Sequence, residues 1–225
     1  GYLPEERGIY MKAKVLEQLI YFGMLRGMKK AEAKQSAQEL MEQLQVTEYQ
    51  NMQAEKLSKG NQQKIQLIAA IIHRPQLIFL DEPFSGLDPV NAVVLRNLVK
   101  KLVKEGKYII LSTHQMETVE EYCKNLVILD RGKTLLSGTL KDIKRAYGRS
   151  NLIVSAEKDV RDIARQEGLE VFEERAAETE YKIQSEEMAC RFLKHMLAEE
   201  IYPLKFQIME PSLQEIFVKK AGESR

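Results

Sequence analysis

The sequence predicts an α/β fold followed by a smaller α+β region. Two short apolar runs, QLIFLD at residues 76–81 and KYIILS at residues 107–112, lie on either side of a helical pattern at residues 92–105, which is the order strand, helix, strand. Because the runs are apolar on both faces, we expect a parallel sheet covered by helices. After residue 150, shorter strands and helices follow one another, which favours helices packed on a mainly antiparallel sheet.

The residues before the first of these strands are predicted to be mostly helical. Apolar residues recur at helical spacing between Leu16 and Met24, and a second helical stretch covers about residues 29–44. Residues 62–74, QQKIQLIAAIIHR, predict a third helix that ends before Pro75, because the residue before a proline is disfavoured in a helix.

After the second strand, the sequence predicts a hairpin and then a series of short elements. Strands at residues 126–130 and 133–137, LVILD and KTLLS, flank a turn at Arg131 and Gly132. The elements expected beyond the hairpin are a strand at 151–155, a helix at 160–166, strands at 169–174 and 180–184, a helix at 186–199, a strand at 204–209 and a helix at 212–221.

The charge of the chain changes sign along its length. Residues 1–150 carry 23 basic and 17 acidic side chains, whereas residues 151–225 carry 11 and 16. The change coincides with YGRSN at Tyr147–Asn151, a break rich in small and polar residues. We therefore expect a domain boundary here, with an accessory α+β domain at residues 149–225.

Composition excludes several classes of protein. The net charge of +1 argues against a nucleic-acid partner. The longest apolar run, Leu67–Ile72, is far shorter than the roughly 20 residues of a membrane-spanning helix. The two cysteines, Cys123 and Cys190, do not have the spacing of metal ligands. A reducing cytosol is the compartment that fits best.

Acidic and imidazole side chains follow the two predicted parallel strands. Asp81 and Glu82 end the first strand, and His114 follows the second, at the edge where ligands bind in open α/β sheets. An aspartate there can hold Mg²⁺ through water, and a glutamate can polarise the water that attacks a phosphate. Taken alone, the acidic pair also fits an ordinary strand that ends in an acidic turn. The turn SGLDP, in which Asp88 precedes a proline-initiated helix, follows closely.

A phosphate site is also indicated at LSKGNQQK, residues 57–64. Ser58 and Gly60 lie at the start of a predicted helix, where backbone N–H groups and the helix dipole attract anions. The sequence nevertheless contains no GxxxxGKS/T loop of the kind that usually cradles the phosphates of ATP.

Four motifs together resemble one family. LSKGNQQK, LIFLDEP, SGLDP and STH, in this order and spacing, resemble the signature, Walker B, D-loop and H-loop of the ATP-binding subunits of ATP-binding cassette (ABC) transporters. GYLPEERGIY resembles the Q-loop region of this family, and EPSLQEIF resembles the tail of its drug- and sodium-exporter branch. The resemblance covers essentially the whole chain and is weakest between Ser150 and Ile208.

The resemblance implies a fold. We expect the C-terminal part of an ABC-type, RecA-like nucleotide-binding domain with a helical subdomain, followed by the small α+β domain. The expected divisions are residues 1–12 for the Q-loop region, 13–56 for the helical subdomain, 57–148 for the signature, Walker B, D-loop and H-loop part of the ATPase core, and 149–225 for the accessory domain.

The resemblance also implies how the phosphate sites are used. In this family two ATP-binding subunits face each other head to tail, and each signature loop caps the ATP held by the other subunit. Ser58 and the backbone of Gly60 are therefore expected to contact the γ-phosphate of the partner's ATP. Asp88 is expected to reach the Walker A region of the partner.

The remaining roles belong to hydrolysis within one subunit. Asp81 is expected to bind Mg²⁺ through water, and Glu82 to act as the general base. His114 is expected to hold the γ-phosphate and the attacking water in line. The Q-loop position carries Glu5 in place of the usual glutamine, and its carboxylate could also bind Mg²⁺. The expected cofactors are thus ATP and Mg²⁺.

The absent Walker A segment and a permease partner complete the expectation. Because Gly1 falls at the Q-loop, we expect a Walker A segment outside this chain, and the chain by itself is expected to be inactive. The complete subunit is expected to hydrolyse ATP and to power a separate transmembrane permease, docked on the helical segment at residues 12–53. This places it in the cytoplasm, peripheral to the inner face of the cell membrane.

Two alternatives remain. An SMC-type chromosome ATPase lobe also carries signature and Walker B motifs without an adjoining Walker A, but no sustained heptad precedes Leu57. A soluble translation-factor ABC protein is not expected to end in EPSLQEIF.

Overall fold

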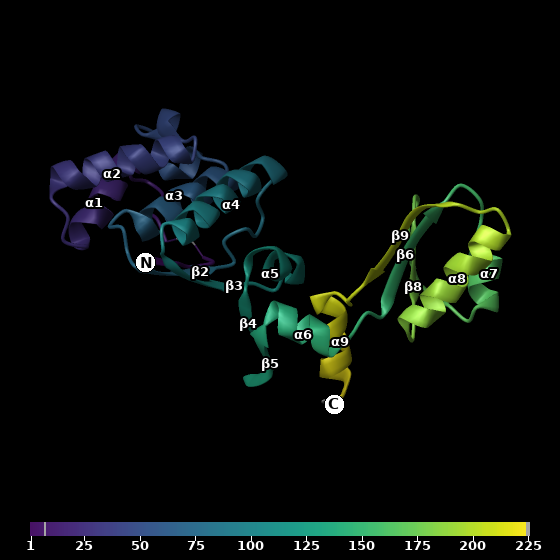
Figure 1. Cartoon of the computed structure of the whole chain (residues 1–225). Helices are drawn as coiled ribbons and strands as arrows, with labels where there is room; N and C mark the ends of the chain where they lie inside the picture. The colour runs from purple at the N-terminus through teal and green to yellow at the C-terminus, as the bar shows by residue number, and fades with distance from the viewer. Residues whose placement is uncertain (7, 224–225) are drawn as a thin grey trace. The chain divides into compact units, whose positions relative to one another are not determined.

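The structure is a computed structural model that describes residues 1–6 and 8–223 (Figure 1). The chain divides into two compact units, Gly1–His114 and Gln115–Arg225, and each buries apolar residues of its own. Within the described residues, none of the helices is long and apolar enough to cross a membrane. The boundary expected at residue 149 lies inside the second unit and stays a prediction.

The described residues of the first unit form a parallel sheet and four α-helices. Its elements are β1 (Tyr2–Leu3), α1 (Val15–Leu25), α2 (Lys30–Gln43), short 3-10 helices at Thr47–Tyr49 and Ala54–Lys56, α3 (Lys59–Ile71), β2 (Leu77–Asp81), α4 (Pro89–Lys104) and β3 (Tyr108–Ser112). The strand order is β1-β2-β3, and both pairings are parallel. The predicted order of strand, helix and strand is therefore confirmed. The third predicted helix starts three residues earlier than expected, because Ser58 caps it.

The sheet is covered on one face by the described residues, whereas the sequence predicted cover on both. Ile78 and Leu80 of β2 are buried in the apolar core with residues of α3 and α4. Phe79 of β2 is 43% exposed, and Tyr108 and Ile110 of β3 are 69% and 52% exposed. Side chains alternate between the faces of a strand, so these residues line one uncovered sheet face. Cover on this second face stays a prediction, because apolarity shows that a face favours burial and does not show what covers it.

Helices α1 and α2 lie within residues 13–56, where a helical subdomain was expected, and that division stays a prediction. The two helices approach closely at Gly23, where a Cβ atom would lie 2.8 Å from the Cβ of Ala33. The 3-10 turns then lead the chain to Ser58 and α3.

The second unit contains a hairpin, a four-stranded sheet and five α-helices among its described residues. They are α5 (Met116–Tyr122), β4 (Asn125–Asp130), β5 (Lys133–Thr139), α6 (Leu140–Ala146), β6 (Asn151–Ala156), α7 (Arg161–Gln166), β7 (Glu170–Glu174), β8 (Thr179–Lys182), α8 (Glu186–Ala198), β9 (Pro203–Met209) and α9 (Leu213–Glu223). The sheet order is β7-β8-β6-β9, with every pairing antiparallel. The expected hairpin and α+β arrangement are confirmed.

Two features of this unit were not predicted. Helices α5 and α6 are each seven residues long, too short for a clear apolar period. The last helix, α9, buries Leu213 and Ile216 with residues of the hairpin and α6, and not with the core beneath the four-stranded sheet. The chain thus returns at its end to the elements that directly follow residue 114.

Candidate functional site

The three parallel strands end at one edge of their sheet and bring sequence-distant residues to it. Glu5 lies two residues beyond β1, and His114 lies two residues beyond β3. Asp81 is the last residue of β2, and Glu82 directly follows it. The pairing register places Asp81 opposite Ser112. This edge is where open α/β sheets bind ligands.

Glu82 and His114 are in direct contact. The Glu82 carboxylate Oε1 accepts a hydrogen bond from the backbone N–H of His114 at 2.7 Å and lies 2.6 Å from its ring Nδ1. The hydroxyl of Thr113 donates to Glu82 Oε2 at 3.0 Å. The Glu82 side chain is 11% exposed, whereas that of His114 is 74% exposed. These hydrogen bonds therefore fix the largely buried carboxylate, whereas the exposed imidazole is accessible to a ligand.

The backbone at Glu82 is strained, which gives its carboxylate this direction. Its φ is 44°, in the left-handed region that non-glycine residues seldom adopt. The conformation is held at both ends, because Glu82 N–H donates to the carbonyl of Ser112 and the Glu82 carbonyl accepts from Ser85 N–H, at 2.9 and 3.1 Å. Such strain is typical of functional positions.

Asp81 offers an oxygen ligand at the same edge. The hydroxyl of Ser112 donates to its carboxylate, and Glu5 follows β1, the strand that pairs with β2. Within residues 1–6 and 8–223, no three acidic, histidine or cysteine side chains gather as a complete metal site. Carboxylate oxygens nevertheless suit Mg²⁺, which is commonly held by one or two protein carboxylates together with water and phosphate oxygens.

The signature and D-loop residues cap two helices. Ser58 caps α3, its hydroxyl accepting from Asn61 N–H at 3.3 Å, and Asp88 caps α4, its carboxylate accepting from Asn91 N–H at 3.0 Å. The hydrogen bonds from Asn91, first from its backbone and then from its side chain, hold the pKa of the Asp88 carboxyl below its usual value. Each helix N-terminus attracts anions.

The seven predicted residues thus form two groups. Glu5, Asp81, Glu82 and His114 belong to the sheet edge, and Ser58, Gly60 and Asp88 belong to the N-termini of α3 and α4. The sequence interpretation missed Thr113 and Asn91. Both had a signal, since Thr113 lies inside the STH motif, and Asn91 is three residues after a capping aspartate.

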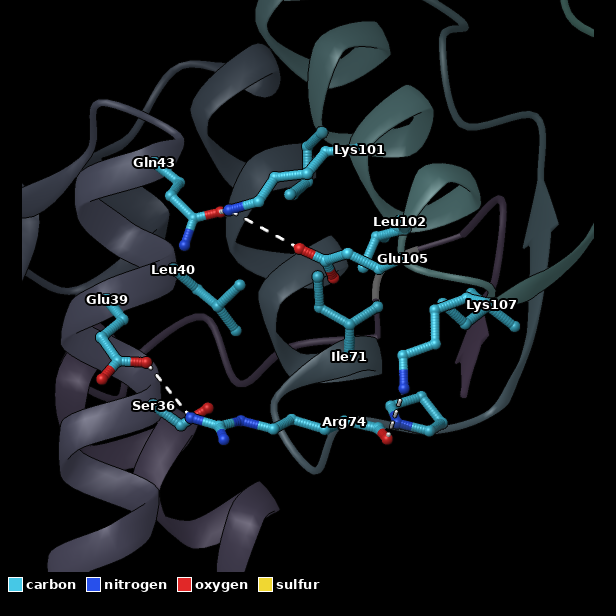
Figure 2. Close-up of a pocket in the computed structure, with 13 residues that line it drawn as sticks. Ser36, Glu39, Leu40, Gln43, Ile71, Arg74, Lys101, Leu102, Glu105 and Lys107 are labelled. Carbon is cyan, nitrogen blue, oxygen red and sulfur yellow. Dashed lines mark hydrogen bonds and ion pairs between the residues drawn. The ribbon is translucent and has the colours of Figure 1, made fainter.

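A separate pocket of about 420 Å³ lies between α2, the end of α3 and the C-terminal half of α4. Figure 2 shows Arg74 reaching toward Glu39, and Lys101 reaching toward Glu105, at its rim. None of the seven predicted residues lines this pocket, so it is not part of the predicted site.

Comparison with known proteins decides the family. A model described as "ATP-binding protein DrrA1-3-like, C-terminal domain" matches residues 138–221. A model described as "AAA domain, putative AbiEii toxin, Type IV TA system" matches residues 5–120, which include all seven predicted residues. The uncharacterized ABC transporter ATP-binding protein YhaQ of Bacillus subtilis is 45% identical over 222 residues, which is 99% of this chain and 74% of YhaQ.

The chain belongs to the ABC transporter ATP-binding proteins.

Other members of this family agree. An uncharacterized ABC transporter ATP-binding protein of Methanocaldococcus jannaschii is 43% identical over 78% of this chain and 67% of its own length. The linearmycin resistance ATP-binding protein LnrL of Bacillus subtilis is 30% identical over 100% and 75%. A solved ATP-binding subunit of an ABC transporter superposes with a TM-score of 0.60 at 33% identity, covering 65% of this chain. The chain spans 61% of that subunit.

Proposed function

We propose that this ABC protein is the ATP-hydrolysing subunit of an exporter and that its two groups of residues serve two different ATP molecules. The contact between Glu82 and His114 at the sheet edge carries the proposal. A buried, oriented carboxylate touching an exposed imidazole is an arrangement that can deprotonate a water beside a phosphate.

The sheet-edge group acts within its own subunit. Glu82 accepts the proton of the attacking water, while the N–H of His114 and the hydroxyl of Thr113 hold the carboxylate in place. The exposed ring of His114 positions the γ-phosphate. Asp81, with Glu5, offers oxygen ligands to Mg²⁺, and a bound Mg²⁺ would neutralise charge that develops on the phosphates.

The helix N-terminus group acts on the ATP of a second subunit. Ser58 presents its hydroxyl and the first turn of α3 presents backbone N–H groups, which together form an anion site that needs no lysine. Asp88, at the start of α4, is proposed to act on the same partner. A head-to-tail dimer is proposed because it would bring the ATP of a second subunit to Ser58 and Asp88.

The Walker A cradle is proposed to come from a polypeptide segment outside residues 1–225. The uncovered sheet face, with Phe79, Tyr108 and Ile110, is an apolar surface suited to pack against such a segment. The matched region covers 74% of YhaQ, so YhaQ also contains residues that have no counterpart in this chain.

The permease partner is proposed to dock on an aromatic cluster beside the Q-loop region. The rings of Tyr10 and Phe22 stack with centroids 5.6 Å apart, and Tyr21 lies edge-on to Tyr10 at 6.2 Å. Tyr10 and Tyr21 are 55% and 48% exposed, while the buried Gln18 amide binds the backbone of Tyr10 on both sides. A rigid, exposed aromatic surface suits a helix of a membrane protein. Docking of the permease on this aromatic cluster would hold the subunit at the inner face of the cell membrane.

The relatives named above are described as ABC transporter or resistance ATP-binding proteins. This favours a permease-coupled exporter over the chromosome-ATPase and translation-factor alternatives.

The test is Glu82→Gln in the complete subunit. The amide fits the same space and keeps the bond from His114 N–H, but it cannot take a proton, so turnover should fall roughly 10²-fold or more. ATP binding should survive, and the variant should elute as a dimer in Mg-ATP and as a monomer without it.

Two controls sharpen the test. Glu32→Gln removes an exposed carboxylate of α2 and should leave turnover unchanged. Adding Ser58→Arg to Glu82→Gln should abolish the nucleotide-dependent dimer by filling the phosphate site. Near-normal hydrolysis by Glu82→Gln would show that the base lies elsewhere.

A further inference from the structure

The N-terminal turns of α3 and α4 touch at one point. A Cβ atom added at Gly60, on the second residue of α3, would lie 2.9 Å from the side-chain Nδ2 of Asn91 on α4 and 3.3 Å from its Cγ. The signature loop and the D-loop are therefore in van der Waals contact through these two residues.

The same amide group holds the D-loop carboxylate. Asn91 Nδ2 donates a hydrogen bond to Asp88 Oδ2, while Asn91 N–H donates to Oδ1. Both oxygens of the Asp88 side chain are thus fixed by one residue. Asn91 consequently connects Gly60 on one side to Asp88 on the other.

A buried lysine lies one turn further along α3. Lys64, one turn beyond Gly60, is 4% exposed. Burial lowers the pKa of its ammonium, and the negative charge of Asp88 acts in the opposite direction.

We propose that Asn91 is a positioning residue that holds the signature loop and the Asp88 carboxylate as one rigid body. The inference rests on the proposed function, in which Ser58, Gly60 and Asp88 all act on the ATP site of the partner. Joined in this way, they meet the partner's phosphates together and in a fixed geometry. A loose Asp88 would leave the signature loop intact and still misalign the composite site.

The functional test is Asn91→Asp in the complete subunit. The side chain keeps its shape, but the side-chain N–H donor to Asp88 is lost. The carboxylates of residues 88 and 91 then face each other at the start of α4. On α3, Lys64 is a charged group that interacts with Asp88. ATP turnover should fall about 10-fold or more because a misplaced group loses its alignment. The fall should shrink toward pH 6, because two neighbouring carboxylates can share one proton.

Asn97→Asp is the matched control. It adds the same charge on the same helix at an exposed position and should leave both turnover and its pH profile unchanged. If Asn91→Asp behaves as Asn97→Asp does at every pH, the positioning role is overturned.

A second measurement tests the contact without hydrolysis. Gly60→Ala should lower the midpoint of thermal unfolding in the unmodified protein, because the new methyl group meets Asn91. In an Asn91→Ala background the nearest remaining atom is the Asn91 Cβ, at 3.5 Å, which is an ordinary contact. There Gly60→Ala should raise the midpoint, because alanine is the better helix former. The same sign in both backgrounds would overturn the contact.

The two failures can be told apart. If the unmodified subunit hydrolyses ATP and Glu82→Gln does not, the proposed function holds, and the Asn91 variants alone decide the inference. If the unmodified subunit does not hydrolyse ATP, the proposed function fails, and the positioning role fails with it.

Discussion

Glu215, in the terminal motif EPSLQEIF, ties α9 to the four-stranded sheet, and its removal should weaken the second unit. Glu215 N–H donates to the hydroxyl of Ser212, and Ser212 N–H donates to the Glu215 carboxylate, each at 3.2 Å, which is a capping box. The same carboxylate accepts from the Asn151 amide of β6 at 3.0 Å and pairs with the Lys182 ammonium of β8. Glu215→Ala removes every bond to the carboxylate at once and leaves only the backbone N–H bond to Ser212.

The expected loss follows from these contacts. Losing the Glu215 half of the capping box costs up to about 1 kcal/mol, and a lost hydrogen bond to a charged group costs about 1.5–3 kcal/mol. The Lys182 and Glu215 side chains are 32% and 18% exposed, so water partly replaces the ion pair. We therefore expect Glu215→Ala to lower the free energy of unfolding by about 2–3 kcal/mol. For a chain of this length that is a fall of roughly 4–12 °C in the unfolding midpoint.

Urea denaturation followed by circular dichroism measures this change, and hydrogen exchange of α9 locates it. Glu215→Gln should lose less, because the amide oxygen can still accept from Ser212 and Asn151. Glu157→Ala removes an exposed carboxylate of the same unit and should change stability by less than about 0.5 kcal/mol. The reasoning is refuted if Glu215→Ala and Glu157→Ala have the same stability.

Two further predictions concern pH and thiol chemistry. Burial raises the pKa of Glu215, but the hydrogen bonds from Lys182, Asn151 and Ser212 outweigh it and leave the pKa below its ordinary value. The stabilisation is thus complete above the unfolded pKa of about 4.3 and is lost as pH falls from there through the lower folded pKa. Wild type and Glu215→Gln should therefore differ most in urea stability at pH 7, and the difference should shrink as pH falls below about 4.3; a constant difference would contradict this. Burial raises the pKa of the Cys123 thiol, whereas Cys190 is exposed. Iodoacetamide at pH 8 should therefore alkylate Cys190 first, as followed by mass spectrometry. Equal alkylation rates of the two cysteines would contradict this prediction.

Much of the fold was predictable because local pattern decides it. The apolar runs at residues 76–81 and 107–112 became β2 and β3 within one residue of the predicted bounds, since short apolar segments rich in Ile and Leu suit a parallel sheet. The short helices α5 and α6 were missed because seven residues hold only two turns. For α6 the cap at Thr139 was the available signal.

The sequence by itself determined which residue types follow each strand and where two helices start, because the order of motifs and the capping side chains Ser58 and Asp88 are local properties. The tertiary structure decided which of these residues touch. Glu82 meets His114, 32 residues away, because β2 and β3 pair in parallel register, and Gly60 meets Asn91 because the turns that start α3 and α4 pack together. Contacts of this kind depend on strand register and helix packing, which no local pattern specifies.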